Sequence, residues 1–202
     1  MSIDDAALEL IQESVRRRSQ VFFSASEVKI VFQTQILSLK NKAIVLANTV
    51  PPDYIAQLVK SSQFFLKVQA VRFVCERILS DGVHILFPLE DMRQIEDSRS
   101  AKRFIFDSNE RVVLEVLNPI DQETVLRKAV LDMSTTGLSI RTPSPSELYA
   151  PGQKFRNMKI IMDGKIYNEV DAHVVYQQVF LSQKGKRYCQ VGFKFEQDHP
   201  NP

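Results

Sequence analysis

The chain of 202 residues contains no tryptophan, only two cysteines and only six glycines. Cys75 and Cys189 lie in separate apolar stretches without CxxC spacing, which argues against a disulfide framework or a zinc site. Six glycines leave little material for a phosphate-binding loop, and GxSxG, HExxH, P-loop and GxGxxG motifs are absent. We therefore expect a protein that is not an enzyme, with no catalytic residues, no metal and no cofactor.

An excess of one charge is also lacking, because 26 basic residues are balanced by 24 acidic ones, for a formal net charge of +2. This balance gives no global field that would attract nucleic acid or a membrane, so any basic site must be local. No apolar run approaches the roughly 18 residues of a membrane span, and Asp4 and Asp5 stand where a signal peptide would be basic. These features predict a soluble cytoplasmic protein without membrane insertion.

The three histidines are scattered along the chain and have no other metal ligands at suitable spacing. His84 and His173 occur in apolar, alternating runs, and we expect both to be strand residues. His199 follows the last such run. The histidines thus give no support for a metal site.

The first half of the chain combines a helical pattern with strand-like runs. Apolar side chains recur every four positions at Ile3, Ala7, Ile11 and Val15, which predicts a helix with Ser2 as its N-cap and arginines 16–18 at its end. Strands rich in Val, Ile, Phe and Leu are predicted within 28–39, 43–50, 64–79 and 83–89, with a short helix over 53–62 and a turn at Asp81-Gly82.

The stretch from Glu90 to Arg103 is almost entirely charged or polar, which indicates a linker or a domain boundary. Six strand-like runs separated by turn residues follow it, at 111–118, 124–133, 137–142, 155–162, 166–180 and 188–196. The expected fold is mostly β, with two small β-barrel domains. We expect residues 1–95 to form an N-terminal split barrel with a leading helix, 96–103 an arginine-bearing linker, and 104–202 a six-stranded antiparallel barrel.

Two short motifs remain once core and turns are assigned. Arg99 and Arg103 lie in the linker, and Asp132, Ser134 and Gly137 lie between two predicted strands. Taken separately, the arginines are typical of a solvated surface and the turn is typical of one that satisfies its own backbone. The 29 residues from Arg103 to Asp132 suffice for two antiparallel strands and their connection, so the linker can lie over the turn.

Together these motifs resemble the PilZ domain, whose signature is RxxxR before the first strand and (D/N)xSxxG some tens of residues later. Arg99 and Arg103 match the first half, Asp132, Ser134 and Gly137 match the second, and "QVGFKFE" is similar to the last strand of the family. The resemblance covers about residues 99–196. It implies a receptor for the bacterial second messenger cyclic di-GMP, bound without turnover by these five residues.

The chemistry of guanine suits the residues that carry this resemblance. The O6 and N7 acceptors of guanine match a guanidinium fork, and its N1–H and N2–H donors match a carboxylate such as Asp132. Ser134 can donate to a phosphate or lock the turn, and Gly137 is expected to allow a positive φ and let the backbone come close to a flat base. A linker this polar is expected to order against the barrel when ligand binds, and to change the arrangement of the two domains.

The N-terminal region is similar in position, size and strand content to the domain that precedes PilZ in flagellar-brake proteins. That resemblance implies regulation of motility or surface behaviour through a protein partner, the flagellar motor or another effector. The number of ligand molecules bound, one or two, remains open. Ser98 stands where many members of the family have a basic residue. Two alternatives also stay open: a PilZ-like interaction module that binds no nucleotide, and a barrel that binds single-stranded nucleic acid.

Overall fold

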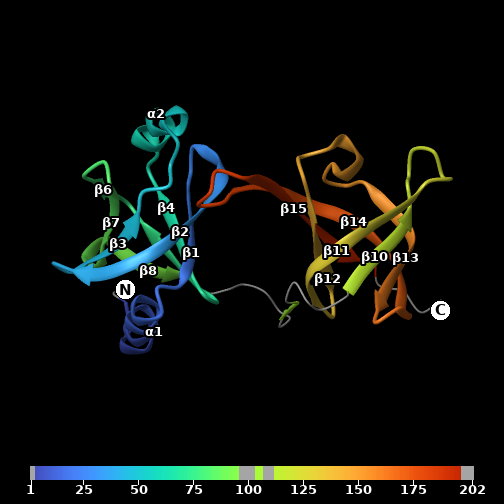
Figure 1. The fold of residues 1–202 in the computed structure, drawn as a ribbon, viewed down its shortest axis with the longest axis horizontal. Coiled ribbons are helices and arrows are strands. Elements are labelled where there is room, and N and C mark those ends of the chain that lie inside the picture. Colours follow the sequence, from blue (N-terminus) through green and yellow to red (C-terminus); the bar gives the residue numbers. More distant parts are fainter. Residues whose placement is uncertain (1–2, 96–102, 107–111, 197–202) are drawn as a thin grey trace, which may run out of the picture. The chain divides into compact units, whose positions relative to one another are not determined.

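The computed structural model describes residues 3–95, 103–106 and 112–196, and strands dominate it (Figure 1). The prediction of a mostly β protein is therefore confirmed. The chain divides into two compact units, of which unit 1 comprises Met1–Ser98 with Phe180–Arg187. Unit 2 comprises Arg99–Val179 with Tyr188–Pro202. The outer end of the hairpin formed by the last two strands thus belongs to unit 1.

Unit 1 contains two helices and eight of the strands. In chain order its elements are α1 (Asp5–Arg16), β1 (Gln20–Ala25), β2 (Val28–Lys40), β3 (Ala43–Ala47), α2 (Pro52–Lys60), β4 (Phe64–Val68), β5 (Val71–Cys75), β6 (Leu79–Ser80), β7 (His84–Pro88), a 3-10 turn (Leu89–Asp91) and β8 (Met92–Ile95). The antiparallel pairings give the order β6-β7-β3-β2-β1-β4-β5-β8. Helices α1 and α2 lie at opposite sides of these strands in Figure 1.

Helix α1 begins later than the sequence pattern predicts. Its N-cap is Asp4 and not Ser2, because the carboxylate of Asp4 accepts a hydrogen bond from the amide of Ala7 at 2.7 Å. An N-cap oxygen must reach a free amide of the first helical turn, and from the helix start at Asp5 only the preceding residue does so. The helix packs on β2 and β4 through its buried residues, which include Ala7 and Ile11.

The polar stretch from Glu90 to Arg103 includes a strand near its start. Residues Met92–Ile95 form β8, which pairs antiparallel with β5, and Met92 is 1% exposed. Backbone pairing does not depend on side-chain polarity, so a charged residue such as Arg93 joins the sheet while its side chain faces solvent. Unit 1 therefore includes this part of the polar stretch.

Unit 2 contains every strand predicted for the second half of the chain. Its elements are β9 (Phe104–Ile105), β10 (Val112–Leu117), β11 (Val125–Ser134), β12 (Gly137–Thr142), a 3-10 turn (Glu147–Tyr149), β13 (Lys154–Met162), β14 (Lys165–Leu181) and β15 (Arg187–Phe195). The strands pair in the order β13-β10-β11-β12-β15-β14, and β13 also pairs with β14. The pairings thus connect six strands in a closed circuit.

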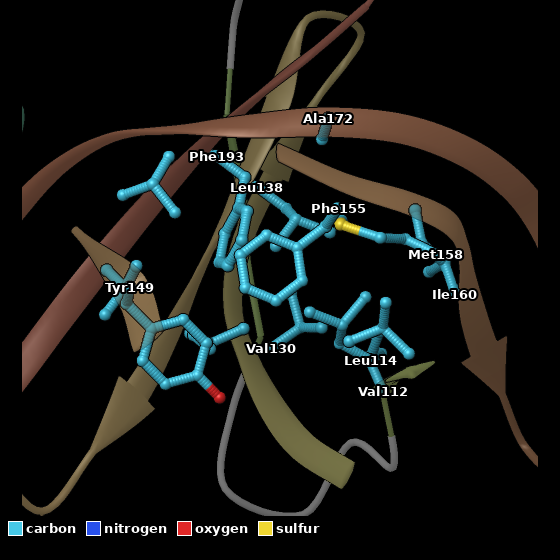
Figure 2. Close-up of a cluster of buried hydrophobic side chains, with 14 of the residues drawn as sticks. Val112, Leu114, Val130, Leu138, Tyr149, Phe155, Met158, Ile160, Ala172 and Phe193 are labelled. Atoms are coloured by element: carbon cyan, nitrogen blue, oxygen red, sulfur yellow. The ribbon is translucent and has the colours of Figure 1, made fainter. Parts of the chain in front are cut away.

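The inward side chains of these strands form the core of unit 2. Figure 2 shows Phe155 near the middle of the cluster, beside Phe193 and Tyr149. The ring of Phe155 stacks on Tyr149 at 5.8 Å between centroids and meets Phe193 edge to face at 5.4 Å. Val112, Leu114 and Val116 alternate inward on β10, as expected for a strand with one buried face.

Candidate ligand-binding site

The turn between β11 and β12 is closed by the hydroxyl of Ser134. Ser134 pairs with Gly137 across the hairpin, and two threonines form the turn between them. The Ser134 hydroxyl accepts from the amide of Thr136 and donates to the carbonyl of Gly137, each at 3.3 Å. Because Ser134 is only 8% exposed, its hydroxyl serves the turn rather than solvent.

Gly137 is required for a different reason than the sequence suggested. The expectation of a positive φ at this residue is wrong, because Gly137 is not among the glycines in that conformation. A Cβ at Gly137 would instead lie 2.1 Å from the carbonyl oxygen of Phe193 on the neighbouring strand β15. The glycine allows the two backbones to approach closely, a role that a residue with any side chain cannot fill.

Asp132 lies near the end of β11, just after a bulge in its pairing with β12. Its Oδ1 accepts from Nη1 of Arg103 at 2.6 Å. Its Oδ2 accepts from the hydroxyl of Ser139 at 2.7 Å and from Nε2 of Gln190 at 3.3 Å. Both carboxylate oxygens are thus engaged, and Ser139, which faces Asp132 across the hairpin, has no exposed surface.

Arg103 reaches this carboxylate because the short strand β9 follows it. Phe104 and Ile105 pair antiparallel with β11, and the amide of Phe106 donates to the carbonyl of Leu131 at 3.0 Å. These contacts hold residues 103–106 on unit 2. Two residues separated by 29 positions therefore form an ion pair in which the Arg103 side chain is 24% exposed and that of Asp132 is 15% exposed.

The surroundings keep Arg103 charged and oriented. Burial lowers the pKa of the Arg103 guanidinium, but the interactions with Asp132 and Tyr176 outweigh burial and raise the pKa above its ordinary value. Tyr176 lies on β14, and a Cβ at Gly192 would come within 2.1 Å of its ring. The ring of Tyr176 therefore packs on bare backbone beside Arg103.

The polar residues around this pair were not found from the sequence. Ser139 lies in a strand that is otherwise almost fully buried, and Gln190 and Tyr176 come from strands far along the chain. Of these three residues, only Ser139 could have been suspected from the sequence, because a small polar residue on a buried strand requires a hydrogen-bond partner. The other two could be assigned only from the strand order.

A comparison with protein families identifies the domain that contains Arg103 and Asp132. A family model for the PilZ domain matches residues 97–202, which is 106 of the 202 residues. The chain belongs to the PilZ domain family. The resemblance expected from RxxxR and DxSxxG is thereby confirmed, and the PilZ domain occupies the part of the chain that contains Arg103 and Asp132.

Solved structures share the fold over nearly the whole chain. The MrkH–c-di-GMP complex of Klebsiella pneumoniae matches with a TM-score of 0.70 at 14% identity, over 95% of this chain and 86% of that chain. YcgR of Escherichia coli in complex with c-di-GMP matches with a TM-score of 0.59 at 12% identity, over 96% and 82%. Both matches include the N-terminal region, where a similarity to flagellar-brake proteins was expected. A search of curated proteins found no match.

Of the other polar residues near the signature, Arg141 is within the described residues. Arg99, the first arginine of the motif, lies outside the described residues, as do Ser98 and Lys102. Arg141 on β12 places its guanidinium 4.4 Å from the ring centroid of Tyr188 on β15, a cation–π contact. Arg141 is therefore held against β15. It is a residue of the hairpin that β11 and β12 form, which we call the Asp132 hairpin.

The histidines and cysteines that the structure describes all lie in strands. His84 lies in β7 and His173 in β14, as predicted, and His199 is outside the described part of the chain. Cys75 and Cys189 are buried free thiols, and burial raises the pKa of both. Within residues 3–95, 103–106 and 112–196, no cluster of His, Cys, Asp or Glu could hold a metal ion. No helix in these ranges is long and apolar enough to cross a membrane.

Proposed function

We propose that the protein is a receptor for cyclic di-GMP that binds its ligand at the Arg103–Asp132 end of the PilZ domain and does not turn it over. The observation that carries the proposal is the ion pair between Arg103 and Asp132, which joins the two halves of the signature in space. The membership in the PilZ family and the fold shared with MrkH and YcgR, both solved with c-di-GMP, support it.

Arg103 is the residue that we assign to guanine. A guanidinium carries five N–H donors, so contacts with Asp132 and Tyr176 do not exhaust its capacity. The fork can present a pair of donors to O6 and N7 while its positive charge offsets that of a phosphodiester. We assign the same role to Arg99.

The turn residues Asp132, Ser134 and Gly137 receive supporting roles in this proposal. Asp132 orients Arg103, and because a carboxylate has about four lone-pair positions it can accept one further donor from the base. Ser134 fixes the turn through its contacts with Thr136 and Gly137. Gly137 keeps β12 close to β15, the strand that carries Gln190 of the polar cluster.

We further propose that both units are small barrels, a split barrel at residues 1–95 and a six-stranded barrel at 104–202, joined by the linker 96–103. The closed circuit of strand pairings in unit 2 supports the second of these. Ligand bound to arginines at both ends of RxxxR would restrain the linker and change the arrangement of the units. The output is then a protein contact that regulates motility or surface behaviour.

Calorimetric titration of the full chain with cyclic di-GMP tests the site. We expect binding by the wild type, a loss of one to two decades in affinity for Arg103→Ala, and an intermediate loss for Arg103→Lys, which keeps the charge without the fork. Arg127→Ala is the matched control, because Arg127 is an arginine of the same unit whose side chain is 73% exposed. Its affinity should equal that of the wild type.

Four outcomes would change the proposal. No heat and no thermal shift at about 100 µM ligand would remove the receptor function and leave the interaction module as the explanation. Equal binding by Arg103→Ala would move the site elsewhere. Unchanged small-angle scattering on ligand addition would remove the rearrangement while leaving the binding, and a salt-dependent gel shift with single-stranded DNA would favour the nucleic-acid alternative.

A further inference from the structure

Unit 1 contains a groove that the PilZ site does not use. It lies beneath α2, has a volume of 570 Å³, and we call it the α2 groove. Its apolar lining consists of Val50, Ile55, Leu58, Val59, Phe64, Ile78 and Ile85. Leu58, Phe64 and Ile85 are at most 8% exposed, so they form the floor of the groove and belong to the core of unit 1.

The outer wall of the groove is an apolar stripe of α2 that faces solvent. Ile55 and Val59 are one helical turn apart on the same face of the helix, and they are 47% and 80% exposed. Leu58 is the only buried residue of this helix. A stripe of this kind at the edge of a groove is typical of a surface that a second apolar face covers.

The polar groups along the groove already have partners within the protein. The Asn48 side chain donates to the carbonyl of Gly82 at 3.0 Å and accepts from the amide of Val50 at 3.1 Å. The Ser61 hydroxyl donates to the carbonyl of Gln57 at 3.0 Å. A small polar ligand would therefore find few groups to orient it, whereas an apolar face could bind by burial alone.

The charges around the groove are mainly negative. Arg77, which lines it, pairs with both Glu90 and Asp91, and Glu76 pairs with Arg93. We count a charged side chain as part of the rim if its residue lines the groove, pairs with a lining residue, or lies within two positions of one. The rim then consists of Asp53, Lys60, Glu76, Arg77, Asp81, Glu90, Asp91 and Arg93. Five acids against three bases leave a formal charge of −2, the opposite sign to the whole chain.

We propose that the α2 groove is a docking site for a basic amphipathic helix of a protein partner. The partner helix places apolar side chains at i, i+3, i+4 and i+7 against Ile55, Val59 and the groove floor. Its basic residues meet the acidic rim and set its orientation. This site lies wholly within unit 1 and does not depend on nucleotide binding by unit 2.

Fluorescence anisotropy with two designed helical peptides of about 18 residues tests the proposal on the full chain. Both probes carry the same leucine face, and their other positions are lysine in one and glutamate in the other. We expect the lysine peptide to bind at least tenfold more tightly than the glutamate peptide in about 50 mM salt, with the difference shrinking as salt is raised. Equal binding of the two peptides, or no binding of the lysine peptide at about 200 µM protein, would overturn the proposal.

The variant Val59→Asp separates apolar contact from charge. It adds negative charge, so a purely electrostatic site would bind the lysine peptide more tightly, whereas the proposed groove should bind it at least tenfold more weakly. Ile120→Asp is the matched control, because Ile120 is 78% exposed and lies in unit 2, and it should leave the affinity unchanged. If wild type dimerises at about 50 µM and Val59→Asp does not, the occupant is a second copy of this chain and the proposal of a partner helix is wrong.

Discussion

The Asp132 hairpin in unit 2 and the α2 groove in unit 1 differ in how their side chains are used. At the hairpin, Arg103, Asp132 and Ser139 are paired with one another and largely withdrawn from solvent. At the groove, Ile55 and Val59 are exposed and the polar atoms are occupied by neighbouring backbone. The first surface offers charged donors and acceptors in fixed positions, and the second offers apolar area.

This difference has a consequence for mutation. A side chain whose partners are buried protein groups supports the fold as well as any ligand, so its removal costs stability. A side chain that faces solvent can be changed with little effect on the fold, so any loss of binding is easier to interpret. The two surfaces should therefore respond in opposite ways to substitution.

The largest effect is expected for Gly137→Ala. The added Cβ would lie 2.1 Å from the Phe193 carbonyl oxygen, which is backbone and cannot rotate away, so we expect a loss of about 3 kcal/mol in the free energy of unfolding. Gly164→Ala is the control, because Gly164 has open space around it and only a positive φ, which predicts a loss of about 1 kcal/mol. Urea denaturation of both variants measures the difference, and equal losses would refute the close-approach explanation.

A smaller effect is expected for Asp132→Ala. The substitution leaves the Arg103 guanidinium partly buried without its counter-charge and leaves Ser139 without its acceptor, at a cost of about 2–3 kcal/mol. Glu115→Ala breaks the pair with Arg127, whose side chain is 73% exposed, and should cost no more than about 1 kcal/mol. Chemical denaturation gives both values, and the comparison fails if the two pairs contribute equally.

At the groove, Val59→Asp should change the free energy of unfolding by no more than about 0.5 kcal/mol, because Val59 is 80% exposed. The same denaturation curves measure it. A loss above about 1.5 kcal/mol would mean that the stripe on α2 stabilises unit 1, and the groove would then have to be probed by substitution at Ile55.

The smallest effect is expected for the stability contribution of Asp81, on the rim of the groove, as the pH is lowered. Hydrogen bonds from the His84 ring, then from the amides of His84 and Val83, lower the pKa of Asp81 from 3.8 to about 2. A lowered pKa stabilises the folded state above the ordinary value and loses that contribution as pH falls towards 2. The difference in melting temperature between wild type and Asp81→Asn should be constant above about pH 5 and vanish near pH 2. A carboxyl titration by NMR with a midpoint near 3.8 would contradict this.

The strands were the most predictable part of the molecule. The six runs expected after residue 110 correspond to β10–β15, because alternation of apolar side chains follows from the two-residue repeat of a strand. The start of α1 was mispredicted and strand β8 was not predicted, in both cases for local reasons. The N-cap is the residue just before the first helical turn, so its identity depends on where the helix begins. An edge strand can form from polar residues when its backbone pairs with a neighbouring strand.

The sequence by itself determined the PilZ signature, the order of its two halves and the 29-residue separation of Arg103 and Asp132, because these are properties of residue type and spacing. Only the tertiary structure decided what the motif residues contact. Ser139, Tyr176 and Gln190 join the pair through strands brought together by the sheet order, and Gly137 is constrained by the backbone of β15. Contacts between distant strands follow from register and packing, which a spacing of residues along one chain does not specify.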